Sequence, residues 1–357
     1  MKTRSVGLIS ILLAGLAGSI VSANVQAEPV RLATVTTLAG TGEAGAVDGP
    51  GSTASLNRPH GITVSASGEI IVADRGNHLI RKIKTDGSVV TLAGTGKAAY
   101  AEGSGAKAAF NEPIAVAIDR KGNIFVADRN NHRIREIAPD GKVKTLAGSG
   151  QAGFADGYDH KAQFNQPYGV ALDDAEITLY VADYLNHSIR AINLLTDQVS
   201  TLAGNGKAGF ADGMGEAAAF NQPYNLKNDG HGALIVPDQN NHAVRRVAMN
   251  GAVTTLAGSG SAGYADGKGR EAQFNNPTGA VAMSDGTVIV ADRNNHRVRR
   301  IAPDGTVTTI AGTGEAAFGD GAAFQAKFNR PLDVDVLSGG RLAVSEENNH
   351  RIRVIGR

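Results

Sequence analysis

The 357-residue chain contains no cysteine and no tryptophan, and only seven tyrosines and ten phenylalanines. Without cysteine the chain has no disulfide framework and no thiol near its N-terminus to carry a lipid. Charge of one sign is also missing: the formal net charge is +1, so no general attraction to nucleic acid or anionic lipid is expected. Glycine is abundant, with 46 residues, which is typical of many short strands joined by turns.

The first 27 residues have the pattern of a secretory signal peptide. Lys2 and Arg4 supply positive charge, residues 6–21 form an uncharged and mostly apolar stretch, and a small-residue cleavage site ends at Ala27. A retained membrane anchor is the weaker alternative, because the apolar stretch is shorter than the ~20 residues that span a bilayer. We therefore expect cleavage after Ala27, a periplasmic or extracellular protein, and one domain over residues 28–357 without a membrane anchor.

The rest of the chain is built from six copies of the pattern D/E-x-x-N-H-x-x-R, spaced by 54 or 55 residues. The copies begin at Asp74, Asp128, Asp183, Asp238, Asp292 and Glu346. An N-x-P element precedes an apolar run in every copy. Each repeat therefore reads as one supersecondary unit that buries its apolar faces against its neighbours.

The same period decides the meaning of a Gly-rich segment, LAGTGEAG at residues 38–45, which contains the spacing G-x-G-x-x-G. That spacing occurs in dinucleotide-binding loops, where a long helix follows and points its N-terminus at a pyrophosphate. Here related segments recur in all six repeats, and no long amphipathic pattern follows any of them. The glycines are therefore interpreted as loop residues that supply backbone freedom, and a nucleotide site is excluded.

The β-rich runs of each repeat predict four short strands joined by tight turns, followed by a loop of about twenty residues. Six such sheets make an all-β, six-bladed propeller of four-stranded antiparallel blades. The last repeat stops after its third strand, whereas an additional strand sequence, VTTLAG, begins at Val35 before the first repeat. We expect this N-terminal strand to complete the last blade and close the ring.

The six in-register N-H-x-[IV]-R elements resemble NHL repeats, in the longer-loop variety of secreted bacterial proteins and of the teneurin propeller. This resemblance covers essentially the whole mature chain and implies the propeller fold. It does not give a function, because NHL proteins are diverse in activity.

The repeated polar and aromatic residues are interpreted as structural. One histidine per blade lies too far from its copies to share a metal ion. We expect the repeated Asp to accept N–H groups of the second hairpin, and the repeated Arg to pair across the blade. Two aromatic residues per repeat are expected to anchor each long loop on its blade, except in the first repeat, where Ala46 and Leu56 take their places.

Function is sought where the repeats differ, at the start of each innermost strand, near the mouth of the central channel. The candidate ligand-binding residues there are His60, Glu112, Tyr168, Tyr224, Asn225 and Asp333. Carboxylates, an amide and an imidazole at one mouth can hold a hard cation such as Ca²⁺ or bind a polar ligand. No catalytic residue is assigned.

Two functions follow. The first is a non-catalytic, monomeric binding scaffold that takes a protein, peptide or glycan on its loop face, and not a nucleic acid. Five arginines give that face a local basic character suited to an acidic partner: Arg58, Arg75, Arg129, Arg293 and Arg330. The alternative is a metal-dependent enzyme with a cation at the mouth. Similarity to the amidating lyase implies several channel histidines, but only His60 lies near the mouth. Similarity to SMP-30/gluconolactonase-like propellers implies carboxylate and asparagine ligands, which here are Glu112, Asn225 and Asp333.

Overall fold

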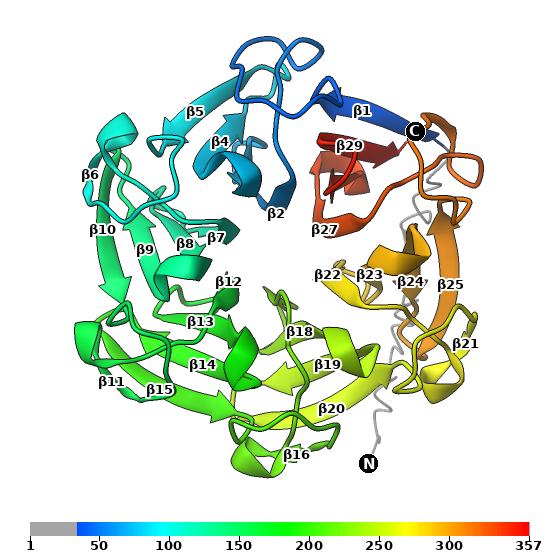
Figure 1. Cartoon of the computed structure of the whole chain (residues 1–357). Helices are drawn as coiled ribbons and strands as arrows, with labels where there is room; N and C mark the ends of the chain where they lie inside the picture. The colour runs from blue at the N-terminus through cyan, green and yellow to red at the C-terminus, as the bar shows by residue number, and fades with distance from the viewer. Residues whose placement is uncertain (1–33, 357) are drawn as a thin grey trace, which may run out of the picture. The chain divides into compact units, whose positions relative to one another are not determined.

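A computed structural model describes residues 34–356, which form six antiparallel β-sheets arranged as propeller blades around a central axis (Figure 1). The six-bladed all-β fold predicted from the repeats is confirmed. Within the described range the helical segments are three-residue 3₁₀ helices, and none is long and apolar enough to cross a membrane. The predicted signal peptide and its cleavage site lie outside the described residues.

Each blade is named here by its repeat, I to VI, and its strands run from the axis outward. Blade I contains β2 (Pro59–Val64), β3 (Ile70–Asp74), β4 (Leu79–Ile83) and β5 (Val89–Ala93). Blade II contains β7 (Pro113–Ile118), β8 (Ile124–Asp128), β9 (Arg133–Ile137), β10 (Lys142–Ala147) and β6 (Gly103–Ser104). Blade III contains β12 (Pro167–Leu172), β13 (Thr178–Asp183), β14 (Ser188–Asn193), β15 (Gln198–Ala203) and β11 (Gly157–Tyr158).

The second half of the ring follows the same order. Blade IV contains β17 (Lys227–Asn228), β18 (Ala233–Asp238), β19 (Ala243–Ala248), β20 (Ala252–Ala257) and β16 (Gly213–Met214). Blade V contains β22 (Pro277–Ala282), β23 (Val288–Asp292), β24 (Arg297–Ile301), β25 (Thr306–Ala311) and β21 (Gly267–Lys268). Blade VI contains β27 (Pro331–Val336), β28 (Leu342–Glu346), β29 (Arg351–Gly356), β1 (Thr34–Ala39) and β26 (Gly321–Ala322).

Short 3₁₀ helices connect the strands. Five join the second and third strands of blades I to V: η1 (Arg75–Asn77), η3 (Arg129–Asn131), η5 (Tyr184–Asn186), η7 (Gln239–Asn241) and η9 (Arg293–Asn295). Four lie in the long loops and one in the β27–β28 connection: η2 (Gly105–Lys107), η4 (Asp159–Lys161), η6 (Gly215–Ala217), η8 (Gly269–Glu271) and η10 (Ser338–Gly340).

Five blades have a fifth strand that the sequence pattern did not predict. Each long loop first runs to the outside of its blade, where two residues pair with the fourth strand, as Gly103 pairs with Val143. A two-residue strand beginning with glycine shows no alternation of apolar and polar residues, so it has no sequence signal. In blade I this strand is reduced to a single bridge between Gly49 and Val89.

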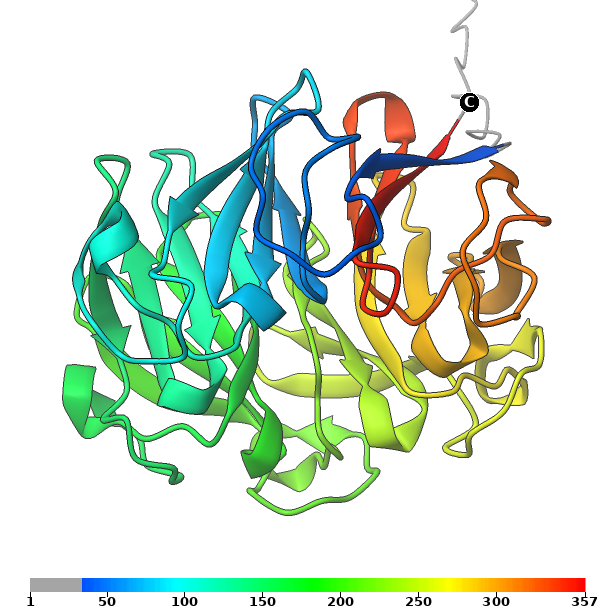
Figure 2. The same ribbon diagram turned by 45° about the horizontal axis from the view of Figure 1, so that its top comes forward.

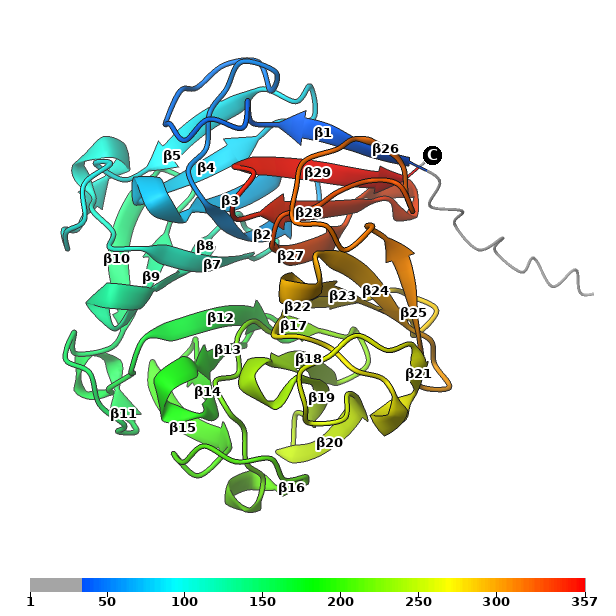
Figure 3. The same ribbon diagram turned by 45° about the vertical axis from the view of Figure 1, so that its right-hand side comes forward.

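The N-terminal strand closes the ring. Strand β1 pairs antiparallel with β29, from Thr34 opposite Gly356 to Ala39 opposite Ile352. Figures 2 and 3 show this blue strand lying along the red C-terminal strand. The predicted closure is thereby confirmed, and blade VI is completed by residues from both ends of the described chain.

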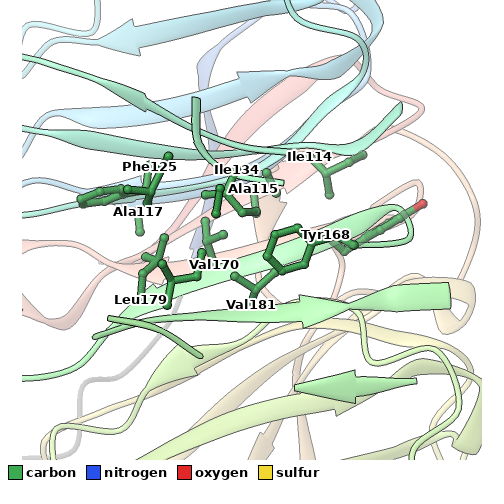
Figure 4. Packing of buried hydrophobic residues seen from close by; sticks show 14 of the residues in the cluster. Ile114, Ala115, Ala117, Phe125, Ile134, Tyr168, Val170, Leu179 and Val181 are labelled. Carbon is green, nitrogen blue, oxygen red and sulfur yellow. The ribbon is translucent and has the colours of Figure 1, made fainter. Parts of the chain in front are cut away.

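The apolar core is divided among the six interfaces between neighbouring blades. In the interface between blades II and III, Ile114 and Phe125 of one sheet face Val170 and Leu179 of the next (Figure 4). Equivalent clusters occupy the other five interfaces. The apolar runs of the inner strands are explained in this way, because both faces of a blade are covered.

The repeated polar residues form one buried cluster inside each blade, as blade III illustrates. The Asp183 carboxylate accepts hydrogen bonds from Asn186 Nδ2 and Arg190 Nη1, both at 2.8 Å. The guanidinium of Arg190 lies between the rings of Phe154 and Phe164, whose centroids are 4.9 and 5.3 Å away. The expected ion pair and loop anchors are present. One expectation is corrected: Asp183 accepts the backbone N–H of Asn165, which approaches the first strand, rather than N–H groups of the second hairpin.

The repeated histidines link neighbouring blades. Each adopts a left-handed backbone conformation, with φ between 48° and 55°, and its Nδ1 accepts the backbone N–H of the residue before the N-x-P proline in the next blade. The pairs are His78–Glu112, His132–Gln166, His187–Gln222, His242–Asn276, His296–Arg330 and His350–Arg58. This ring of six bonds gives the repeated histidine its structural role.

Candidate functional site

The channel mouth collects three kinds of segment at one end of the propeller. Pro59, at the start of β2, pairs with Asp74, at the end of β3, so the 3₁₀ helix after β3 lies beside the start of the innermost strand. The fourth strand runs antiparallel to the third and ends on the same side, where the long loop begins. The repeat therefore places its variable positions together at this face, as expected from the sequence.

Aromatic side chains form the floor of the mouth. His60 Nε2 lies 2.7 Å from the Tyr224 hydroxyl, and the two rings are stacked with centroids 5.3 Å apart. Tyr168 lies against Tyr224 at 4.7 Å and stacks on Tyr184 at 4.2 Å. His60, Tyr168 and Tyr224 are at most 5% exposed. Three of the predicted residues are thus brought together by blades I, III and IV.

These aromatic groups are uncharged at neutral pH. Burial lowers the pKa of His60 well below its ordinary value, and the nearby guanidiniums of Arg75, Arg293 and Arg129 lower it further. Burial likewise raises the pKa of Tyr224, and it raises that of Tyr184 to about 12. The floor therefore presents neutral rings and hydroxyls.

A chain of ion pairs crosses the mouth above this floor. Glu112 accepts from Arg129 at 2.5 Å and from Arg75 at 3.2 Å. Glu347 in turn pairs with Arg75 at 3.4 Å and with Arg293 at 2.8 Å. We call these five residues the arginine–glutamate chain. It joins blades II, I, VI and V, and Arg129 also lies over the Tyr168 ring at 5.2 Å.

Both glutamates are held ionised by this arrangement. Burial alone would raise their pKa values, but the charges and hydrogen bonds of Arg75 and Arg129 hold the pKa of Glu112 below its ordinary value. Arg293, Arg75 and Arg58 do the same for the pKa of Glu347. The two carboxylates differ in access, since the Glu112 side chain is 27% exposed and that of Glu347 only 2%.

Asn225 and Asp333 lie outside this group of contacts. Each lies two residues after the N-x-P proline and faces a glycine of the preceding blade. A Cβ on Gly169 would lie 2.7 Å from the Cα of Asn225, and a Cβ on Gly279 would lie 2.5 Å from the Cα of Asp333. Close approach of the inner strands therefore fixes both positions. Asn225 Oδ1 accepts the N–H of Leu226, and Asp333 Oδ2 accepts that of Ile62.

Asp333 belongs instead to a second polar group around Lys227, three residues beyond Tyr224 along blade IV. Lys227 Nζ donates to the carbonyl oxygens of Ile62 at 3.1 Å and Val334 at 2.8 Å. It also lies 3.1 Å from Asp335 Oδ2 and 3.6 Å from Asp333 Oδ2. One lysine of blade IV thus reaches the backbone of blades I and VI, and pairs with two carboxylates of blade VI.

Several residues of the mouth were missed by the sequence analysis. Tyr184, Gln239 and Glu347 occupy the same repeat position as Arg75, Arg129 and Arg293, directly after the repeated acidic residue. The Tyr184 hydroxyl lies 2.9 Å from Gln222 Oε1 and 3.0 Å from Gln239 Oε1, and its single hydrogen can be donated to either. Reading this position across all six repeats would have found them, because its neighbour is nearly invariant while it changes from blade to blade. Among residues 34–356, no three His, Asp or Glu side chains are grouped as metal ligands.

Comparison with known proteins gives a family match over most of the chain. The family model for the teneurin NHL domain matches residues 97–313, and that for the NHL repeat matches residues 56–83 and 328–355. The chloroplastic protein SUPPRESSOR OF QUENCHING 1 of Arabidopsis thaliana is 32% identical over 277 residues. NHL repeat-containing protein 2 of Gallus gallus is 30% identical over 342 residues.

These two alignments cover 73% and 83% of this chain but only 26% and 46% of the relatives, so the chain spans less than half the length of either. Among solved structures, an auxiliary nutrient binding protein of Bacteroides ovatus superposes with a TM-score of 0.69 at 17% identity. That superposition covers 91% of this chain and 76% of the other. At this level of identity the likeness is one of fold.

Proposed function

Because the chain belongs to the teneurin NHL-domain family of β-propellers, we propose that it is a non-catalytic binding module that takes a ligand or partner at its channel mouth. The observation that carries this proposal is the separation of roles within one motif. The repeated Asp, Asn, His and Arg make hydrogen bonds and ion pairs that hold each blade together and join it to the next. The residue next to the repeated acid differs among blades and faces the mouth, where fold maintenance does not dictate its identity.

We also propose that the module is exported, with a mature chain beginning at Glu28. The proposal rests on the charged, apolar and small-residue segments in residues 1–27. N-terminal sequencing of the protein recovered from periplasmic and culture-medium fractions tests it. A sequence beginning with Glu28 supports export, whereas an intact Met1 in the cell lysate alone contradicts it.

Binding at the mouth is tested by a ligand panel with a pair of matched variants. The thermal midpoint is measured with peptides, neutral and acidic oligosaccharides, and organic acids, because a ligand that binds only the folded state raises it. Gln222→Trp adds bulk beside Tyr184 at the mouth, and Gln198→Trp adds the same bulk at the exposed start of β15. A shift abolished by Gln222→Trp but retained by Gln198→Trp supports the proposal. A shift lost in neither variant places binding elsewhere and overturns it.

A metal-dependent lyase or hydrolase is the second candidate, and the His60–Tyr224 pair favours it. An imidazole that stays neutral can bind a metal ion, and His60 Nε2 lies 2.7 Å from the Tyr224 hydroxyl. Metal content of the purified protein, measured by mass spectrometry for the parent chain and for His60→Ala, tests this function. One retained ion per chain that is lost in His60→Ala supports the enzyme; equal metal content in both proteins argues against a cation held by His60.

A further inference from the structure

The mouth carries more positive charge than its own acidic groups neutralise. Arg58 and Arg330 lie at its rim, 3.5 and 3.8 Å from Glu347, and add to the three arginines of the arginine–glutamate chain. Five guanidiniums therefore share two carboxylates, a formal charge of +3, while the whole chain carries only +1. This excess is local, and it comes from blades I, II, V and VI.

The guanidiniums also have donors to spare. Among the described residues, the Arg293 guanidinium donates only one hydrogen bond, from Nη2 to Glu347. Arg75 uses one nitrogen for each glutamate. Arg58 and Arg330 reach Glu347 only at ion-pair distance, and their side chains are 47% and 41% exposed. Since a guanidinium carries five N–H donors, this cluster has N–H groups free for further oxygen ligands.

The surroundings strengthen an ionic contact at this place. The side chains of Arg75, Arg129 and Arg293 are 17–19% exposed, so they are largely shielded from water but still accessible. Buried, uncharged rings lie next to them: Arg129 lies over the Tyr168 ring at 5.2 Å, and all three arginines are close to His60. A charge-assisted hydrogen bond over such a floor is less weakened by solvent than one on an open surface.

We propose, building on the binding function above, that the mouth binds the oxyanion group of a small ligand, a carboxylate or a phosphate, through Arg75, Arg129 and Arg293. Planar guanidinium forks match both groups in geometry and charge. Glu112 occupies part of this site as an internal carboxylate: it bridges Arg75 and Arg129 and is exposed enough to leave. Glu347, which is buried among four arginines, remains in place as their common anchor.

The test is calorimetric titration of the full mature chain with inorganic phosphate and with citrate, at constant ionic strength maintained by chloride. The parent protein binds at least one of the two at a single site. Arg293→Gln weakens binding about tenfold or more, because one charge-assisted contact is lost. Arg120→Gln removes the same charge from the exposed β7–β8 turn, on the opposite face, and leaves the affinity unchanged.

Glu112→Gln gives the sharper result, because removal of the internal competitor tightens anion binding, by about tenfold. Folding of every variant is verified by its thermal midpoint. If Arg293→Gln does not fold, the exposed Arg330→Gln replaces it and is expected to weaken binding severalfold. Binding of phosphate alone identifies a phosphorylated ligand and binding of citrate alone a carboxylate ligand; both support the proposal.

The proposal is overturned if neither anion binds the parent protein or Glu112→Gln, if Arg120→Gln weakens binding as much as Arg293→Gln, or if Glu112→Gln weakens it. This failure is distinct from failure of the binding function itself. A neutral ligand whose binding is blocked by Gln222→Trp would retain the module and exclude only the oxyanion.

Discussion

Asp183 and Tyr184 are neighbours in the chain, but they belong to two regions that differ in how much the residue type varies among the blades. Asp183 is fully buried in the polar cluster of blade III, and five blades have Asp and one has Glu at this position. Tyr184 faces the channel mouth, where the six blades contribute three arginines, a tyrosine, a glutamine and a glutamate. A one-residue step along the motif thus separates the part that every blade needs from the part that each blade can vary.

The difference follows from what each position must satisfy. The repeated acid is fully buried and has to accept hydrogen bonds from two side chains and one backbone N–H, which suits a carboxylate. The residue directly after the repeated acid, such as Tyr184, makes no such buried contacts that its own blade requires. Its chemistry is therefore available for a ligand, and substitutions in the two regions should have very different effects on stability.

The largest effect is expected from Arg190→Met, compared with Arg129→Met. Arg190 is fully buried and pairs with Asp183 and Asp156, so its loss leaves the Asp183 carboxylate without its cation. Breaking a buried pair costs about 3–5 kcal/mol, whereas the Arg129–Glu112 pair, in which the Glu112 side chain is 27% exposed, is worth less, about 1 kcal/mol. Urea unfolding of the two variants measures both. Equal losses would show that the two regions do not differ as described.

Lys227 is the exception, because it is unique among the repeats and yet structural. Lys227→Met leaves the buried Asp333 beside Asp335, with an expected loss of about 3 kcal/mol at pH 7. Burial raises the pKa of Asp333 even with Lys227 present. With a raised pKa in the folded state, the ionised form of Asp333 destabilises the fold and the protonated form does not. The stability lost in Lys227→Met should therefore be smaller at pH 5 than at pH 7.

The matched control for Lys227 is Lys227→Met with Asp333→Asn, which removes both charges. Unfolding free energies at the two pH values should then differ little between the double variant and the parent chain. A loss in Lys227→Met that is independent of pH would mean that packing, rather than the carboxylate, is what Lys227 supports.

A smaller, pH-dependent effect is expected for the histidine ring. His187 Nδ1 accepts the N–H of Gln222 in the next blade, and burial lowers the pKa of His187. Because this pKa is lowered in the folded state, the contribution of His187 to stability is complete above the unfolded pKa of about 6.5. It is lost as the pH falls through the pKa of His187 in the folded protein. His187→Asn, which tolerates the left-handed backbone, should cost about 1 kcal/mol at pH 7.5.

That cost should diminish as the pH is lowered toward 5, because protonation removes the same acceptor from the parent chain. Comparing the parent and the variant across pH cancels the titration of every other group, including the buried carboxylates. A constant difference would show that His187 contributes packing only.

The smallest effect concerns blade I, where Arg81 lacks the two aromatic rings that flank its counterparts. Ala46 stands where blade III has Phe154, and it is exposed. Ala46→Phe should place a ring beside the Arg81 guanidinium and stabilise the chain by about 0.5 kcal/mol. Ala46→Leu, measured beside it by urea unfolding, adds apolar area without a ring. An equal gain from Leu would attribute the effect to burial.

The fold could be read from the sequence because its signals are repeated six times. The strand pattern, the closure by residues 34–39 and the structural use of His187 and Arg190 all rest on positions that recur in register. Within the candidate site, His60, Tyr168 and Tyr224 were found because they differ from their counterparts at one repeat position. Whether these residues, Glu112, Asn225 and Asp333 bind a ligand stays a prediction.

What the sequence could not provide was the pairing of unique residues across the axis. Lys227 contacts residues more than 100 positions away, and neither its spacing nor its neighbours in the chain signal such a partner. The bridging of Glu347 by arginines of blades I, V and VI is of the same kind. Contacts of this type depend on how many blades meet and at what radius, which only the assembled ring defines.

The pairing of β1 with β29 also determines how the molecule comes apart. An open array of repeats can unravel from a free end, one unit at a time. Here Thr34 lies opposite Gly356, so neither terminal unit can leave without breaking a sheet that the other helps to form. Joining segments over 300 residues apart is slow, because the loop must close before the contact contributes. The ring should therefore unfold as one cooperative unit and refold with closure as a late step.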